Sequence, residues 1–393
     1  MEYLTPAQVA EKWEVSRRSV RQYLAHDRIP GVVRVNNRIL IPADAEKPAD
    51  LRFAANKSKV AQTPAFNPFV LTVGCYNPGE AEAFLNGLED EEKRTIGLAE
   101  LAYYRGEADR TRELTRTLAQ TKSIQTQIGV LLMGVVSSML TDDPESIVNN
   151  YRFLHRVTDV AAKNPKYEKT GQLFSLYCNI LVHNTDAIAF PDFGVDAFAV
   201  DDALKPMAIY AYARYLLLTG NVSRGIGLAE GALIMMKPLR PVSAIYLALA
   251  IAMGYIVTGT WDRAEYYFRY AWSLAAPDGL IAPFAEFRCL LSGLTEKCLR
   301  EEHPEAYKRV MALSSVYLHN WIFVHNALTG NTVSDKLTPT EFNVAMLAAR
   351  DASNNDISEM LNISVHSVRS HLRNIFNKLS ITTRKELKAY VIR

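Results

Sequence analysis

Residues 353–379 read SNNDISEMLNISVHSVRSHLRNIFNKL, and this stretch decides the fold of the carboxyl-terminal end. Ser353 can cap one helix, with Asp356 completing a capping box, and Ser364 can cap a second helix. The two helix starts are eleven residues apart, which fits a short helix, a turn at Asn362 and a longer helix. The stretch therefore predicts a helix-turn-helix.

The second of these helices is predicted to be amphipathic. Its buried stripe comprises Val368, Leu372, Ile375, Phe376 and Leu379. Its free face carries Arg369, Ser370, Arg373 and Asn377. Such a face suits the major groove of DNA, because a guanidinium group can bind O6 and N7 of guanine and an Asn amide can pair with adenine. An ordinary solvated face is the alternative interpretation.

The charge distribution favours the DNA interpretation. Residues 363–393 hold seven basic residues and one acid. An excess of this sign in one small helical unit is typical of a surface that attracts phosphates. The chain as a whole carries a net charge of only +2, so its basic character is concentrated at the two ends.

These motifs resemble the carboxyl-terminal DNA-binding domain of LuxR-type bacterial transcription regulators. The resemblance is carried by the opening Leu337-Thr338-Pro339-Thr340-Glu341, by the scaffold helix after Ser353 and by Ser367-Val368-Arg369 with His371. It implies a four-helix domain over residues 335–393, whose final helix, Thr383 to Val391, holds a dimer contact. It also implies that Arg369, Ser370 and Arg373 face bases and that Ser367 and Lys378 lie near phosphates. Ser364 and Asn377 complete the predicted contact set.

Two positions depart from the family pattern. Asp351 stands where the family usually has Gly, and Thr340 stands where Arg often precedes Glu341. Asp tolerates a left-handed backbone better than most residues, so we expect the helix end at Asp351 to be preserved. The missing arginine removes one peripheral polar contact.

The amino-terminal end contains a second signal of the same kind. Thr5 can cap a helix with Pro6 in its first turn, and Ser16 can cap a second helix. Residues 32–41 then alternate at strand period around Asn36-Asn37, which predicts a hairpin. Seven bases against two acids between residues 12 and 41 make this region basic as well.

This segment is similar to the winged helix-turn-helix heads of excisionase and MerR-type proteins. Since no long coiled-coil segment follows, the excisionase-like head is the closer comparison. The resemblance implies helix contacts to DNA from Ser16, Arg17, Arg18, Ser19, Arg21 and Gln22. It implies wing contacts from Arg34, Asn37 and Arg38. A small domain that kept this fold but binds protein is the alternative.

The middle of the chain predicts an array of helical hairpins. From about residue 80 to 328 the pattern is helical, with breaks, among them Gly106, Gly220 and Gly259, that follow one another roughly every 37 to 44 residues, a period typical of stacked repeats. The unit from Ala252 through Tyr255, Gly259 and Phe268 to Ala271 resembles a tetratricopeptide repeat. Hairpins of this kind bury a continuous core when stacked and leave a concave surface for a peptide, a partner or a small effector.

The composition is that of an ordinary globular protein, with 49% apolar and 22% charged residues. Four scattered cysteines without metal-ligand spacing or a secretory signal indicate reduced, mostly structural thiols. The most apolar run, Ala244 to Val257, is too short for a bilayer and predicts a buried helix. No phosphate-binding loop, nucleophile elbow or metal motif is present, so we predict no enzyme activity, no cofactor and no metal.

The sequence therefore predicts a mainly α protein with an amino-terminal winged helix-turn-helix (1–45), a linker (46–79), a tetratricopeptide-like helical repeat domain (80–330) and a LuxR-type domain (335–393). We expect a cytoplasmic, homodimeric transcription regulator that binds double-stranded DNA, without membrane contact. A small-molecule or protein effector would act at the repeat domain. Two alternatives remain open: a scaffold or adaptor that uses the repeats to bind proteins, and a recombination accessory factor.

Overall fold

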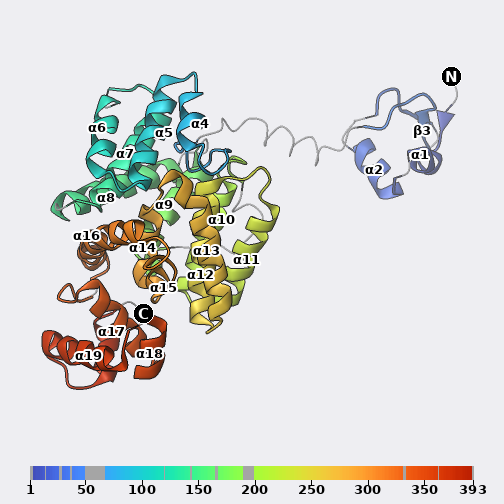
Figure 1. The fold of residues 1–393 in the computed structure, drawn as a ribbon. Coiled ribbons are helices and arrows are strands. Elements are labelled where there is room, and N and C mark those ends of the chain that lie inside the picture. The colour runs from blue at the N-terminus through green and yellow to red at the C-terminus, as the bar shows by residue number, and fades with distance from the viewer. Residues whose placement is uncertain are drawn as a thin grey trace. The chain divides into compact units, whose positions relative to one another are not determined.

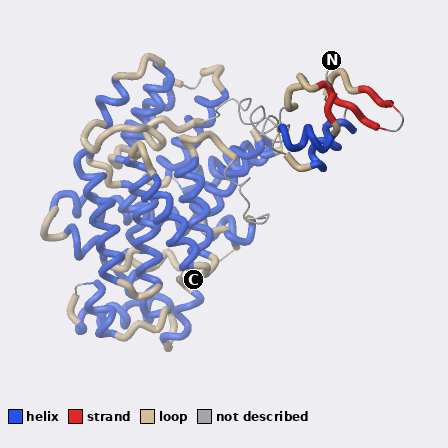
Figure 2. Tube along the Cα trace, turned by 90° about the vertical axis from the view of Figure 1, so that its right-hand side faces the viewer, coloured by secondary structure: helices blue, strands red, loops and turns tan. Residues whose placement is uncertain are grey.

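The computed structural model describes residues 3–13, 15–25, 29–35, 38–48, 67–118, 120–141, 144–163, 167–188, 199–330, 333–361 and 363–391. Contacts between residues group the chain into two units, residues 1–64 and residues 65–393. Helices dominate the described residues, and Figure 2 shows strands only in the first unit. The predicted mainly α class is confirmed.

The first unit combines two short helices with a three-stranded antiparallel sheet in the order β1-β3-β2. Its elements are β1 (Tyr3–Leu4), α1 (Pro6–Lys12), α2 (Arg17–Ala25), β2 (Val33–Val35) and β3 (Arg38–Pro42). Thr5 caps α1 as predicted, in a capping box with Gln8. The sequence did not predict β1, whose two residues are too few to show a strand period. The small core of this unit comprises Val9, Ala10, Trp13, Val20, Leu24, Ile29 and Ile41.

The second unit is helical throughout its described part (Figure 1). Its α-helices are α4 (Ala81–Asn86), α5 (Glu91–Tyr104), α6 (Ala108–Thr117), α7 (Ile124–Ser138), α8 (Pro144–Ala162), α9 (Glu168–Leu181), α10 (Lys205–Leu218), α11 (Val222–Met235), α12 (Pro241–Val257), α13 (Trp261–Ala275), α14 (Ala282–Phe287), α15 (Leu294–Leu299), α16 (Pro304–Thr329), α17 (Pro339–Ala349), α18 (Asn354–Leu361) and α19 (Val365–Leu379). Its 3₁₀ turns are η1 (Thr185–Ala187), η3 (Ala276–Asp278), η4 (Arg288–Leu290) and η5 (Arg384–Ala389).

One type of turn closes three of the helix pairs. Gly106, Gly220 and Gly259 end α5, α10 and α12 with φ values of 77°, 82° and 73°. In each turn the next N–H donates, at 2.8 Å, to the carbonyl oxygen five residues earlier. Glycine adopts this left-handed backbone without steric cost, which reverses the chain within a few residues. The predicted breaks at these glycines are confirmed, while the likeness to tetratricopeptide repeats stays a prediction.

Helix α12 lies in the middle of the core. Every residue from Pro241 to Gly254 is buried, and α12 packs against α10, α11, α13 and α14. The prediction that the apolar run Ala244–Val257 forms a buried helix is therefore confirmed. Among the described residues, none of the helices is both long and apolar enough to cross a bilayer.

The segment before α4 belongs to the core of the second unit. Phe69, Leu71 and Val73 are buried there. The carboxylate of Glu100 accepts hydrogen bonds from the N–H groups of Val70 and Thr72, at 2.6 and 2.8 Å, and thereby fixes this segment to α5. Residues 71–74, which the sequence assigned to the linker of residues 46–79, are consecutive buried residues of this core.

A second buried carboxylate lies among aromatic side chains. Glu286 of α14 accepts hydrogen bonds from the hydroxyls of Tyr103 and Tyr246 at 2.6 and 2.9 Å. Burial raises the pKa of Glu286 to about 7, although these two hydrogen bonds act in the opposite direction. Burial likewise raises the pKa of Glu100 to about 7.

These pKa values predict a pH dependence of stability. A carboxyl whose folded pKa lies above its unfolded value stabilises the fold fully below the unfolded pKa, and this contribution is lost as pH rises through the folded pKa. We therefore expect these two carboxyls to lower the melting temperature between about pH 5 and pH 8, against an opposite contribution from His183 and His325, whose burial lowers their pKa. Glu286→Gln keeps an acceptor for both tyrosines and should make this fall smaller, by roughly 1–3 kcal/mol in unfolding free energy. Thermal unfolding followed by circular dichroism measures this change in stability. Glu113→Gln, at an exposed position on α6, is the control. An unchanged pH profile for Glu286→Gln would contradict the assignment.

Candidate nucleic-acid interface

Caps at the predicted positions build the helix-turn-helix. The N–H of Ser353 donates to Asp356 Oδ2 at 2.8 Å, and the N–H of Asp356 donates to Ser353 Oγ at 3.2 Å, so the predicted capping box is present. Ser364 caps α19 by accepting from the N–H of Ser367 at 3.0 Å. The predicted turn residue Asn362 lies outside the described residues.

The end of α17 has the backbone that the sequence predicts. Asp351 has a φ of 64°, the left-handed conformation for which the family usually supplies Gly. Its N–H donates to the carbonyl of Ala348 at 3.1 Å, and Lys388 donates to its carboxylate at 3.1 Å. The left-handed helix end is therefore kept without a glycine.

The two faces of α19 separate as predicted. Val368, Leu372, Ile375 and Leu379 are buried, and Phe376 is partly buried. Ser364, Arg369, Ser370, Arg373, Asn377 and Lys378 are exposed, and Ser367 is half-buried. Arg369 and Arg373 have no hydrogen-bond or ion-pair partner among the described residues. Their guanidinium groups are therefore free to meet an external acceptor.

Other basic residues of this domain are engaged internally. Lys378, predicted to lie near a phosphate, donates to the buried carboxylate of Glu341 at 2.6 Å. Burial tends to raise the pKa of Glu341, but the hydrogen bonds from Lys378 and Thr338 outweigh it and hold this pKa below its ordinary value. Arg384 donates to the carbonyls of Ala348 and Ala352 and thereby joins η5 to the end of α17. Part of the basic excess therefore stabilises the domain itself.

The predicted last helix is shorter than expected. Instead of a helix from Thr383 to Val391, the structure has the 3₁₀ segment η5 (Arg384–Ala389). At the start of η5, the N–H of Thr383 donates to Glu386 Oε1 at 2.7 Å. After η5, the carbonyl of Tyr390 accepts a hydrogen bond from the N–H of Ser334 at 3.1 Å. Because Tyr390 pairs with the segment before α17, the chain leaves the helical path there.

The rest of the helical unit contacts the scaffold side of this domain. Helix α15 packs on α18, and η4 and α16 pack on α17 (Figure 1). Gly293, at φ 89°, lies so close to α18 that a Cβ there would be 2.1 Å from the carbonyl oxygen of Met360. The exposed face of α19 is left uncovered by this contact.

The amino-terminal unit repeats the cap seen in α19. The N–H of Ser19 donates to Ser16 Oγ at 3.1 Å and starts α2, on which Arg17, Arg18 and Arg21 are exposed. Of the other predicted contacts, Asn37 lies outside the described residues, as do the side chains of Gln22, Arg34 and Arg38. The backbones of Arg34 and Arg38 pair with Ile39 and Val35 in the hairpin.

The comparison with known families adds one finding. Residues 335–391 match the luxR family of bacterial regulatory proteins (GerE). This segment is therefore a luxR-family domain, as its motifs predict, of a kind found in DNA-binding transcription regulators. No curated protein and no solved structure matches the chain. The resemblances of the amino-terminal unit and of the helical array stay predictions.

Sequence reasoning missed two features of this domain. The pairing of Lys378 with Glu341 joins residues far apart in sequence, although both belong to the quoted family motifs. The contact of Gly293 with α18 had no sequence signal beyond the glycine itself, since its need for a small residue arises from packing between distant segments.

The Gly293 contact yields a prediction. We expect Gly293→Ala to push α18 away from α15, because the added methyl overlaps a backbone oxygen. Hydrogen exchange of the α18 amides should then accelerate. Gly279→Ala is the matched control, since Gly279 also has positive φ, 70°, but an added Cβ meets nothing within 4 Å. Equal exchange in the two variants would show that α18 does not depend on this contact.

Proposed function

We propose that this protein is a sequence-specific DNA-binding transcription regulator in which α19 enters the major groove. The luxR-family match of residues 335–391 is the observation that carries the proposal. The exposed face of α19 supports it, because Arg369 and Arg373 lie on it without a partner in the described part of the chain, and Ser370 and Asn377 lie beside them. Arg369 and Arg373 would read guanines, while Ser364 and Ser367 at the start of α19 would meet phosphates.

We further propose that two copies bind together. In this proposal, which follows the LuxR resemblance, the dimer contact lies at the last segment, where Lys385 and Lys388 of η5 are exposed. A symmetric pair would place two copies of α19 in successive major grooves, about 34–36 Å apart, on an inverted repeat.

The amino-terminal unit is proposed as a second, weaker DNA contact. The exposed bases of α2 would bind backbone phosphates, and the tether would raise the local concentration of this head near DNA already held by α19. The helical array between the heads is proposed to receive an effector or a partner, since it packs directly on α17 and α18.

The reading role of α19 is tested with an operator selected from random DNA by the intact chain. We expect Arg369→Ala and Arg373→Ala each to weaken binding to that operator by about 1–3 kcal/mol and to relax the choice of one base pair. Arg116→Ala, an exposed arginine on α6, should leave binding unchanged. If both α19 variants select and bind the operator as the wild type does, another surface reads the sequence.

The amino-terminal head is tested by salt dependence. Replacing Arg17 and Arg21 with Ala should make the plot of log affinity against log salt shallower, by roughly one for each phosphate that the head no longer binds. The selected sequence should stay the same, because α19 chooses it. An unchanged affinity and slope would instead mark this head as a protein-binding module.

A further inference from the structure

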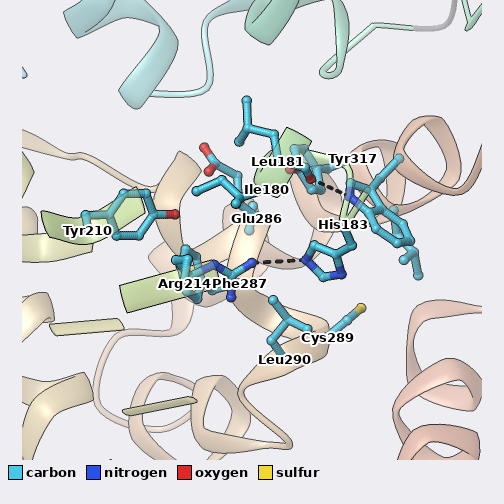
Figure 3. Close-up of a pocket in the computed structure, with 13 residues that line it drawn as sticks. Ile180, Leu181, His183, Tyr210, Arg214, Glu286, Phe287, Cys289, Leu290 and Tyr317 are labelled. Atoms are coloured by element: carbon cyan, nitrogen blue, oxygen red, sulfur yellow. Dashed lines mark hydrogen bonds between the residues drawn. The ribbon is translucent and has the colours of Figure 1, made fainter. Parts of the chain in front are cut away.

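Helices α9, α10 and α16 and the α14–η4 segment surround a small cavity in the helical unit (Figure 3). The space open to the centre of a water molecule is about 40 Å³, enough for about three waters or a small organic molecule. The wall of the cavity contains three aromatic side chains, Phe287, Tyr317 and Trp321. Its polar groups include Arg214 and His183.

Arg214 is a buried cation without a matching carboxylate. Arg214 lies on α10 and is only 5% exposed. No acid of the described residues forms an ion pair with it. Its Nη1 donates to the sulfur of Met253 at 2.7 Å, and its Nε has no hydrogen-bond partner in the described part of the chain. Buried arginines are usually paired, as Arg288 is with Glu296 at 2.6 Å. The guanidinium of Arg214 also lies over the Phe287 ring, 4.7 Å from its centre, but no carboxylate of the described residues pairs with it, so it is suited to an anion from outside.

His183 offers a second unused donor beside it. Arg214 Nη2 lies 3.0 Å from His183 Nε2, and Figure 3 shows the two side chains facing each other. A guanidinium can only donate, so Nε2 accepts and a neutral imidazole carries its proton on Nδ1. Burial, and then the charge of Arg214, lower the pKa of His183 well below its ordinary value, which keeps the ring neutral. Among the residues that the structure describes, none accepts a hydrogen bond from the buried Nδ1–H.

The charge of Arg214 acts on Glu286, the acid on the cavity wall, and tends to lower the pKa of this carboxyl. Glu286 directs Oε1 to the hydroxyls of Tyr103 and Tyr246 and forms no ion pair with Arg214. Two N–H donors, one of them on a cation, thus remain without acceptors in a mostly apolar cavity.

We propose that this cavity is a binding site for a small carboxylate. Its carboxylate group accepts hydrogen bonds from Arg214, and its short hydrocarbon part lies against Phe287, Tyr317 and Trp321. Arg favours carboxylates because its planar fork matches their two oxygens. The aromatic wall favours an acid with an apolar tail over inorganic phosphate.

The site also has a structural connection to the luxR-family domain. The wall residues of α14 and η4 lead directly into Gly293 and α15, which hold α18, and α16 leads from Trp321 to α17. A ligand in the cavity would therefore affect the contacts of α15 with α18 and of α16 with α17. That regulatory consequence rests on the proposed function, whereas carboxylate binding itself does not.

The test uses the full chain and two independent measurements, thermal shift and isothermal titration calorimetry. The probes are sodium acetate, propionate, butyrate and benzoate at constant ionic strength, with propionamide as the neutral analogue and sodium chloride and phosphate as anion controls. We expect at least one carboxylate to bind saturably and to raise the melting temperature, and propionamide to do neither.

Two variants connect the binding to the cavity. Arg214→Met keeps length and apolar contact but removes the charge, and should weaken the carboxylate about ten- to hundredfold. Arg214→Lys keeps the charge without the fork and should bind at an intermediate level, so it remains informative if Arg214→Met does not fold. Arg369→Ala should bind the carboxylate as the wild type does, which separates this result from DNA binding.

The opposite results are equally clear. The proposal is overturned if no carboxylate binds beyond the chloride control, if propionamide or phosphate binds as well as the acids, or if a folded Arg214 variant keeps full affinity.

Discussion

The exposure of the outer face of α19 depends on which side of the luxR-family domain packs against the rest of the helical unit. Contacts from α15, η4 and α16 reach α17 and α18, and Gly293 permits an approach that no side chain at that position would allow. The apolar stripe of α19, which includes Val368 and Leu372, is buried inside its own domain. The outer face of α19 is consequently left open, although the domain is firmly packed within a large helical unit.

The electrostatics of this end differ from a simple sum of its charges. Lys378, Arg384 and Lys388 are each paired within the domain, and these contacts fix η5 and α19 to α17. The positive charges left for an external partner are therefore fewer than the sequence suggests, and they include Arg369 and Arg373 on α19. A surface with few, well-placed arginines is better suited to reading bases than to general phosphate attraction.

Local signals predicted much of this structure. The caps at Thr5, Ser353 and Ser364, the glycine turns of the hairpins and the stripe of α19 were all readable, because each depends on residues a few positions apart. The burial of Phe69–Val73, the 3₁₀ form of η5 and the cavity around Arg214 were not readable, because each depends on segments far apart in sequence. Arg214 in particular lies within a run of helix-forming residues and carries no motif; only packing shows that its charge is buried.

The central claim is that the outer face of α19 contacts DNA. Hydrogen–deuterium exchange of the full chain, with and without an operator selected by that chain, tests it most directly. We expect the largest new protection to fall on residues 364–378, with little change in the amides of α12. Tight binding with protection confined to the helical array, and none in α19, would contradict it.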